Sequence, residues 1–328
     1  MAVSIRACLA LLALAPSAAC GAQTVPDEHA APLVLERTIP LKDVHGRIDH
    51  LAVDIQHQRL FVAELGNGSV EAIDLARGVS LGRIAGLKEP QGLAYLPARD
   101  ELAVASGGDG SVRFYRAGDL RPDGVVQVGG DADNMRVDSR GRIVVGYGSG
   151  GLATIDPASR KIVARLNLPA HPESFRMQGE MVFVNLPDAK RIVVGDLAAD
   201  RITATWPTNH FWNFPMVLDV ASRTLAVVYR LPARLQLLDA ATGVVKLDQK
   251  TCGDADDVFF DAKRRRVYVT CGAGAVDVVD LVRRDQSVSV ATRSGARTGL
   301  FVPELDRLFV AARAGGQDAA VLVYRPQP

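Results

Sequence analysis

The chain has 328 residues, of which 48% are apolar and 23% charged, and its formal net charge is +1. This is the composition of a globular protein with enough apolar residues for a sizeable buried core. A balance so close to neutral excludes a strongly basic surface, and no nucleic-acid partner is expected.

The N-terminal segment has the layout of a secretory signal peptide. Residues 1–6 are a short basic start, residues 7–15 an apolar run and residues 16–22 a tail of small residues. The apolar run is too short to span a bilayer, so no transmembrane segment is expected. Removal of residues 1–22 predicts a periplasmic or secreted protein. The alternative is a lipid anchor at Cys20, because residues 17–20 also resemble a bacterial lipobox, although Ser17 stands where Leu, Val or Ile is usual.

A unit of about 42 residues then repeats seven times, after a polar, proline-containing linker at residues 23–32. The first apolar strand of each unit ends at Asp54, Leu96, Asp138, Gln178, Asp219, Asp261 and Pro303, in steps of 42, 42, 40, 41, 42 and 42 residues. Each unit offers up to four short, turn-bounded strands and no helical periodicity. The sequence therefore predicts an all-β, seven-bladed β-propeller with four-stranded blades, forming a single domain over residues 33–328.

The ring is expected to close through the N-terminal strand. The seventh unit ends after its third strand at Pro328, whereas residues 33–41, LVLERTIPL, have the pattern of a fourth strand. We expect this segment to complete the last blade. Closure removes the open sheet edge that would otherwise promote aggregation, and a monomer is expected.

One unit carries a family signature. Its second strand reads Val267-Tyr268-Val269-Thr270, followed by Cys271 and Gly272. This resembles the signature of the YVTN-type seven-bladed β-propeller repeat proteins (YncE-like, secreted bacterial proteins), although the literal Tyr-Val-Thr occurs in one unit. The resemblance implies an exported propeller whose fold leaves its function open, since lactonases and a subunit of quinoprotein amine dehydrogenases use a similar ring.

The same unit holds the two cysteines that remain after removal of residues 1–22, Cys252 and Cys271. An even pair in an oxidising compartment favours a disulfide, the alternative being two buried thiols. The hairpin turn at residues 261–265 brings both cysteines towards one edge of the blade. Their register is offset by a few residues, so the loop must bend for the bond to form.

Acidic residues recur where the chain enters the first strands, which in a propeller lie around the central channel on one face. Asp49, Asp133, Glu173, Asp256 and Asp257 occupy these positions, with His50 and Asn134 beside them and Arg297 on the same face. Clustered carboxylates favour calcium or another divalent cation, or an amine-bearing ligand. The alternative is that they cap turns. Arg136 and Arg176 lie within first strands, and we expect carboxylates of neighbouring blades to pair with them.

An aromatic segment, WPTNHFWNF at residues 206–214, leads into the fifth unit and contains both tryptophans of the chain. His210, Trp212 and Asn213 are candidates for a wall that stacks on a sugar or planar ligand. The alternative is an aromatic wedge between two blades.

Motifs for specific chemistry are missing from the sequence. It contains no Cys-x-x-Cys-His and no phosphate-binding P-loop. We therefore expect an exported, non-enzymatic binding protein or scaffold that engages a partner protein or a small polar ligand at the loop face, and no cofactor is predicted. The alternative is a lactonase-like or other metal-assisted hydrolase that uses the acidic collar.

Overall fold

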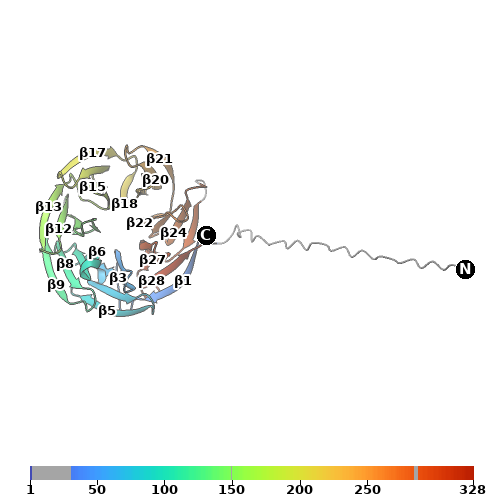
Figure 1. The fold of residues 1–328 in the computed structure, drawn as a ribbon, viewed down its shortest axis with the longest axis horizontal. Helices are drawn as coiled ribbons and strands as arrows, with labels where there is room; N and C mark the ends of the chain where they lie inside the picture. Colours follow the sequence, from blue (N-terminus) through green and yellow to red (C-terminus); the bar gives the residue numbers. More distant parts are fainter. Residues whose placement is uncertain (2–30, 149, 284–286) are drawn as a thin grey trace. The chain divides into compact units, whose positions relative to one another are not determined.

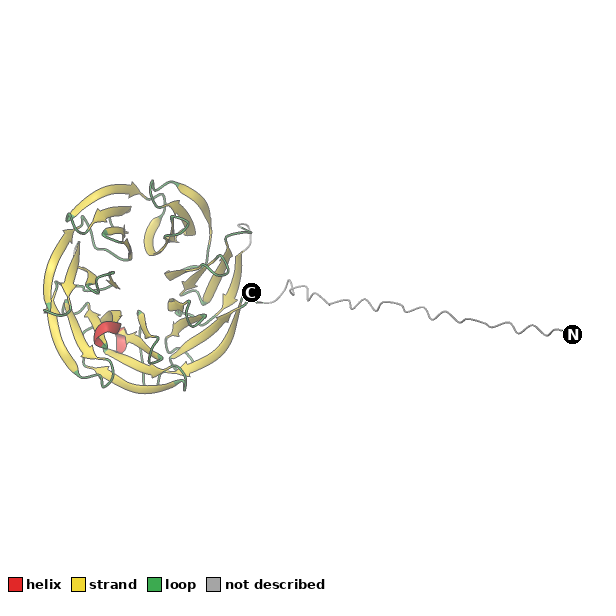
Figure 2. Ribbon diagram, viewed as in Figure 1, coloured by secondary structure: helices red, strands yellow, loops and turns green. Residues whose placement is uncertain are grey.

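Each repeat unit forms a meander of four antiparallel strands, and seven such blades form a ring (Figure 1). The computed structural model describes Met1 and residues 31–148, 150–283 and 287–328. Apart from Met1, the predicted signal peptide at residues 1–22 lies outside these residues. The predicted all-β fold with seven four-stranded blades is confirmed, and Figure 2 shows strands and turns throughout the ring. No segment of the described chain is a helix with the length and hydropathy of a membrane span.

The blades follow the chain in order. Blades 1 to 3 contain β2 (Leu51–Asp54), β3 (Arg59–Glu64), β4 (Ser69–Asp74), β5 (Val79–Ala85); β6 (Pro90–Leu96), β7 (Glu101–Ser106), β8 (Ser111–Arg116), β9 (Pro122–Gln127); and β10 (Met135–Val137), β11 (Ile143–Tyr147), β12 (Gly151–Asp156), β13 (Lys161–Asn167). Blades 4 to 6 contain β14 (Phe175–Gln178), β15 (Met181–Leu186), β16 (Arg191–Asp196), β17 (Arg201–Pro207); β18 (Phe211–Asp219), β19 (Thr224–Leu231), β20 (Ala233–Asp239), β21 (Val245–Lys250); and β22 (Ala255–Asp261), β23 (Arg266–Cys271), β24 (Ala275–Asp280), β25 (Ser287–Ala291). Blade 7 contains β26 (Thr298–Val302), β27 (Arg307–Ala312), β28 (Ala320–Pro326) and β1 (Leu33–Pro40), and two short 3₁₀ turns lie at η1 (Leu65–Asn67) and η2 (Pro97–Arg99).

Apolar side chains on both faces of the second and third strands form the core between neighbouring blades. All six residues of β3 are buried, whereas most of the outer strand β5 is exposed. Between blades 2 and 3, for example, Phe114 packs in one cluster with Val145 and Ile155. The near-continuous apolar runs of the middle strands follow from this burial on two sides, and burying each such side chain stabilises the fold by about 1.5–3 kcal/mol.

The N-terminal strand closes the ring as predicted. Strand β1 pairs antiparallel with β28, from Leu33 opposite Pro326 to Pro40 opposite Ala320, and the two lie side by side in Figure 1. Glu36 forms an ion pair with Arg307 of the same blade. Arg37 donates to the backbone oxygen of Leu75 in blade 1 at 3.0 Å, which ties the closing strand to its neighbour.

Turns on the face away from the entry loops are joined between blades by arginine–carboxylate pairs. Arg264 of blade 6 donates two hydrogen bonds to Asp306 of blade 7, both at 2.7 Å. Arg59 likewise joins blade 1 to Asp100 of blade 2. These pairs fix the spacing of the blades on one face. The opposite face, formed by the loops that lead into the first strand of each blade, is here called the entry face.

Candidate functional site

A recurring β-bulge places the collar residues at the axis. In blades 1, 3 and 4 one residue of the second strand bonds to two successive residues ahead of the first strand. In blade 1, the Asp49 N–H donates to the Ala63 oxygen at 2.7 Å and the Ala63 N–H donates to the His50 oxygen at 3.0 Å. In blade 6 the register shifts between Ala255 and Asp257, so Asp256 is the extra residue. A bulge redirects side chains from the faces of the sheet, and here it directs them to the channel.

The predicted collar assembles around one small cavity. A space of about 30 Å³ on the entry face is lined by Arg47, Asp49, His50, Asp133, Asn134, Glu173, Ser174, Phe214, Asp256 and Asp257. All five predicted carboxylates thus come together, from four different blades, with His50 and Asn134. The cavity has room for one or two water molecules or a single small head group, and not for a sugar ring.

Arginines neutralise two of the five carboxylates. Arg47 donates to Asp49 at 2.8 Å. Asp256 accepts from Arg230 of blade 5 and lies 3.0 Å from Nε of Arg297. The mixed acidic and basic rim is therefore present, as one pair within the entry loop of blade 1 and two pairs between blades.

The other three carboxylates have no such neutralisation. Among the described residues, Asp133 and Glu173 have no Lys, Arg or His nitrogen within 4.0 Å. Asp257 accepts a hydrogen bond from the Gly299 N–H at 2.9 Å, and His50 is its nearest basic group, at 3.9 Å. Carboxyl groups without a cationic partner are thus concentrated where blades 3 and 4 meet the cavity.

Burial shifts the pKa values of these groups strongly. Desolvation raises the pKa of Asp257 to about 8 and that of Glu173 to about 7, and it raises the pKa of Asp133 well above its usual range. The carboxylates of Asp49 and Asp256 add to the effect at Asp133. Desolvation lowers the pKa of His50 to about 4, so its imidazole is neutral at pH 7. Such a site gains free energy from an added cation or proton.

Replacing Glu173 by Gln should make stability less dependent on pH. The folded-state pKa of about 7 exceeds the ordinary 4.5, so the folded protein retains a proton that the unfolded chain loses. The contribution of Glu173 to stability therefore falls as pH rises from about 4.5 to about 7. We expect E173Q to exceed the wild type by on the order of 1–2 kcal/mol at pH 8 and by much less at pH 5 in urea unfolding. The exposed variant E304Q controls for loss of a negative charge, and an advantage of E173Q that is equal at both pH values would contradict this prediction.

A larger cavity occupies the channel below the collar. It measures about 430 Å³ and shares His50 and Asp257 with the collar cavity. First-strand side chains line the rest, most of them apolar, together with Arg136 and Arg176. The expectation that carboxylates of neighbouring blades pair with these arginines is wrong for the described residues. Arg136 instead donates to the Met135 oxygen at 2.6 Å, and Arg176 to the Phe175 oxygen at 2.8 Å.

The aromatic segment is mostly strand rather than loop. Trp206 lies near the end of β17. Residues 211–214 form the start of β18, which pairs with the long strand β19. Trp206 packs on Phe183 with ring centres 5.9 Å apart, and the fully buried Asn213 donates to Asn185 Oδ1 at 3.0 Å. Asn213 thus joins blade 5 to blade 4, and Trp206 does so through the apolar cluster that it shares with Met216 and Leu225 of blade 5.

The other two predicted residues of this segment lie away from the collar. Trp212 is 51% exposed. His210 lies 2.8 Å from Asp248 and packs edge-on against Tyr229. Neither lines the collar cavity or the channel cavity, so the structure does not bring them together with the acidic residues.

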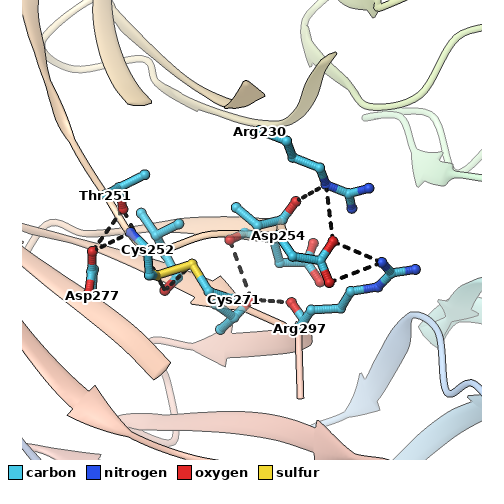
Figure 3. The surroundings of a disulfide bond; sticks show 11 residues. Arg230, Thr251, Cys252, Asp254, Cys271, Asp277 and Arg297 are labelled. Atoms are coloured by element: carbon cyan, nitrogen blue, oxygen red, sulfur yellow. Dashed lines mark hydrogen bonds and ion pairs between the residues drawn. A yellow bond between two sulfur atoms is a disulfide. The ribbon is translucent and has the colours of Figure 1, made fainter. Parts of the chain in front are cut away.

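The predicted disulfide is present and lies beside the rim (Figure 3). The Cα atoms of Cys252 and Cys271 are 5.9 Å apart, within the usual range. Asp254, in the loop that the disulfide holds, lies 3.1 Å from Arg297 and 3.6 Å from Arg230. These arginines also hold Asp256, so the bridge and the ion pairs together fix one side of the collar.

One cluster elsewhere has the composition of a metal site but already holds a cation. Ligand atoms of Asp54, His57 and Asp100 lie within 4.8 Å of one another. The Arg59 guanidinium donates to Asp54 at 2.7 Å and also hydrogen bonds with Asp100. Arg59 therefore supplies the positive charge that these carboxylates need.

Comparison with known proteins supports the fold. No protein-family model and no curated protein matches the chain. A chain in the solved structure of hydrazine synthase from Kuenenia stuttgartiensis is similar, with a TM-score of 0.74 and 16% identity over 87% of this chain and 98% of that chain. At this identity the likeness concerns the seven-bladed propeller alone, and the YVTN resemblance stays a prediction.

Proposed function

We propose that this chain is an exported binding protein that receives the cationic group of a small polar ligand in the acidic collar. The observation that carries the proposal is the unneutralised pair Asp133 and Glu173, which face the same small cavity from adjacent blades. A primary ammonium group has three donors and one charge, so it can satisfy both carboxylates at once.

The size and spacing of the collar favour an ammonium group over a divalent metal. Calcium takes six to eight oxygen ligands at about 2.3–2.6 Å. Within the described chain, no three collar carboxylates place ligand atoms within 4.8 Å of one another. Calcium binding would require the carboxylates to move inwards, and it is the second candidate.

The disulfide supports export, because such bonds persist in oxidising compartments. A periplasmic or secreted YVTN-type propeller is the family and location that we propose. The entry face is also where we place any protein partner.

Ammonium binding should raise the melting temperature of the wild type. A ligand that binds only the folded state at ten times its Kd stabilises by about 1.4 kcal/mol, which corresponds to roughly 2–4 °C here. We would add ethylammonium, 1,4-diaminobutane or calcium chloride to the wild type, to the double variant D133N/E173Q and to a control, D119N/E304Q, with the same charge change on exposed turns. The amines should shift the wild type and the control, and not D133N/E173Q.

Three outcomes would overturn this proposal. A shift with calcium alone would assign a metal site. Metal-dependent turnover of a panel of lactones would assign the hydrolase. Equal amine shifts in the wild type and D133N/E173Q would place the binding outside the collar.

A further inference from the structure

Two arginines from adjacent blades project into the channel cavity at the same position of the inner strand. Arg136 lies in β10 and Arg176 in β14. The equivalent residues of the other five blades are all apolar, namely Ala52, Ala94, Val217, Phe259 and Phe301, and these line the same cavity. At this level of the inner strands the channel wall is therefore apolar except on the side formed by blades 3 and 4, and His50 and Asp257 line the cavity at its collar end.

Protein groups satisfy these guanidinium groups only in part. Beyond the two backbone oxygens, Arg136 is 3.4 Å from Asn134 Oδ1 and Arg176 is 3.4 Å from Ser174 Oγ. No carboxylate oxygen of the described residues comes within 4.0 Å of either. A guanidinium carries five N–H donors, so several remain directed into the cavity.

The two positive charges also repel each other. Desolvation lowers the pKa of both arginines, and the charge of Arg136 lowers that of Arg176 further. Asp257 is an acid of the cavity wall whose charge acts on both arginines, and burial raises its pKa to about 8. His50, which lines the same space, is neutral. The cavity thus contains two arginine side chains and, among the described residues, no carboxylate in contact with either.

We propose that the channel cavity binds a small organic acid, whose carboxylate is held by Arg136 and Arg176 together. Two planar guanidinium groups present paired donors that match the oxygens of a carboxylate. The volume of about 430 Å³ suits a small ligand, and Leu51, Leu93 and Phe301 provide an apolar wall for its hydrocarbon part. This site adjoins the ammonium site of the collar, with which it shares His50 and Asp257, but the proposal does not rest on that site.

Calorimetric titration with three probes tests the proposal. Benzoate, succinate and inorganic phosphate would be titrated into the full chain, into R136M/R176M and into the control R116M, which removes a charge from an exposed pair with Asp119. We expect benzoate or succinate to bind the wild type and R116M with equal affinity. The double variant should lose at least about tenfold, since each hydrogen bond to a charged group contributes strongly.

The stability of the unliganded variants separates a binding role from a structural one. Methionine has similar volume and no charge, so R136M/R176M should melt at or above the wild-type temperature if the arginines serve a ligand. A double variant that fails to fold would overturn the proposal, as would wild-type protein that binds neither carboxylate. If phosphate binds and neither carboxylate does, the site would be assigned to inorganic phosphate and not to an organic acid. The variant R176K keeps the positive charge but loses the planar guanidinium group with its paired donors. It should fold normally and bind the carboxylate probe several-fold more weakly than the wild type, and an unchanged affinity would also contradict the proposal.

Discussion

A chain that lacks residues 33–41 should fail to form a stable ring and should aggregate. The deletion removes β1 and leaves the backbone of β28 as an open sheet edge. It also removes Leu33, Ile39 and Leu41, which are at most 2% exposed. Loss of buried side chains of this size costs about 2–5 kcal/mol each, which together approaches the whole stability of a typical domain. Solubility, melting temperature and gel-filtration profile would measure the effect.

Two point variants in β1 distinguish ring closure from local effects. Ile39→Ala, at a buried position, should lower the free energy of unfolding by about 2–4 kcal/mol. Leu35→Ala, in the same strand but 49% exposed, should change it by less than about 0.5 kcal/mol. Unchanged melting and a monomeric elution profile for the deletion would contradict the closure by β1.

Removal of the disulfide should lower the free energy of unfolding by about 3 kcal/mol. The bond joins residues 19 positions apart, and closing a loop of this length reduces the freedom of the unfolded chain by about this amount. The double variant C252A/C271A avoids placing a hydroxyl at the fully buried Cys271. Urea unfolding should show a lower midpoint than the wild type.

Reduction of the wild type provides the matched control. Wild-type protein treated with a thiol reductant should unfold at the same urea concentration as C252A/C271A, and the double variant itself should not respond to the reductant. Two reactive thiols in denatured, unreduced wild type would contradict the bond.

The architecture could be predicted because the period and the apolar first strands fix it jointly. The same register predicted that Asp49, Asp133 and Glu173 would converge, and they line one cavity. The pattern of apolar and polar residues along the sequence does not show where a strand contains a β-bulge. A bulge interrupts the alternation of apolar and polar residues, so Asp256 and Asp257 were expected in a loop although they lie within β22.

The partners of individual side chains could not be predicted from composition. The aromatic segment gave no means of distinguishing Trp206, which packs on Phe183, from the half-exposed Trp212, because the two side chains take their directions from different strands, β17 and β18. For Arg136 and Arg176 the sequence does contain a signal of their place in the channel. At the aligned positions that line the collar and the channel, units three and four alone combine an acid with an arginine three residues later, Asp133 with Arg136 and Glu173 with Arg176. This places an acidic level above a basic level on one side of the channel.

Ring closure by β1 also constrains the order of folding. Glu36 and Arg307 contact each other across 271 residues of sequence, and β1 is synthesised first while its partner β28 comes last. Blades 1 to 6 consist of local hairpins that can form in turn, whereas the last blade must wait for the complete chain. A ribosome-bound intermediate would therefore hold six blades and one unpaired strand, and a chain truncated before β28 would share the defect of one that lacks β1.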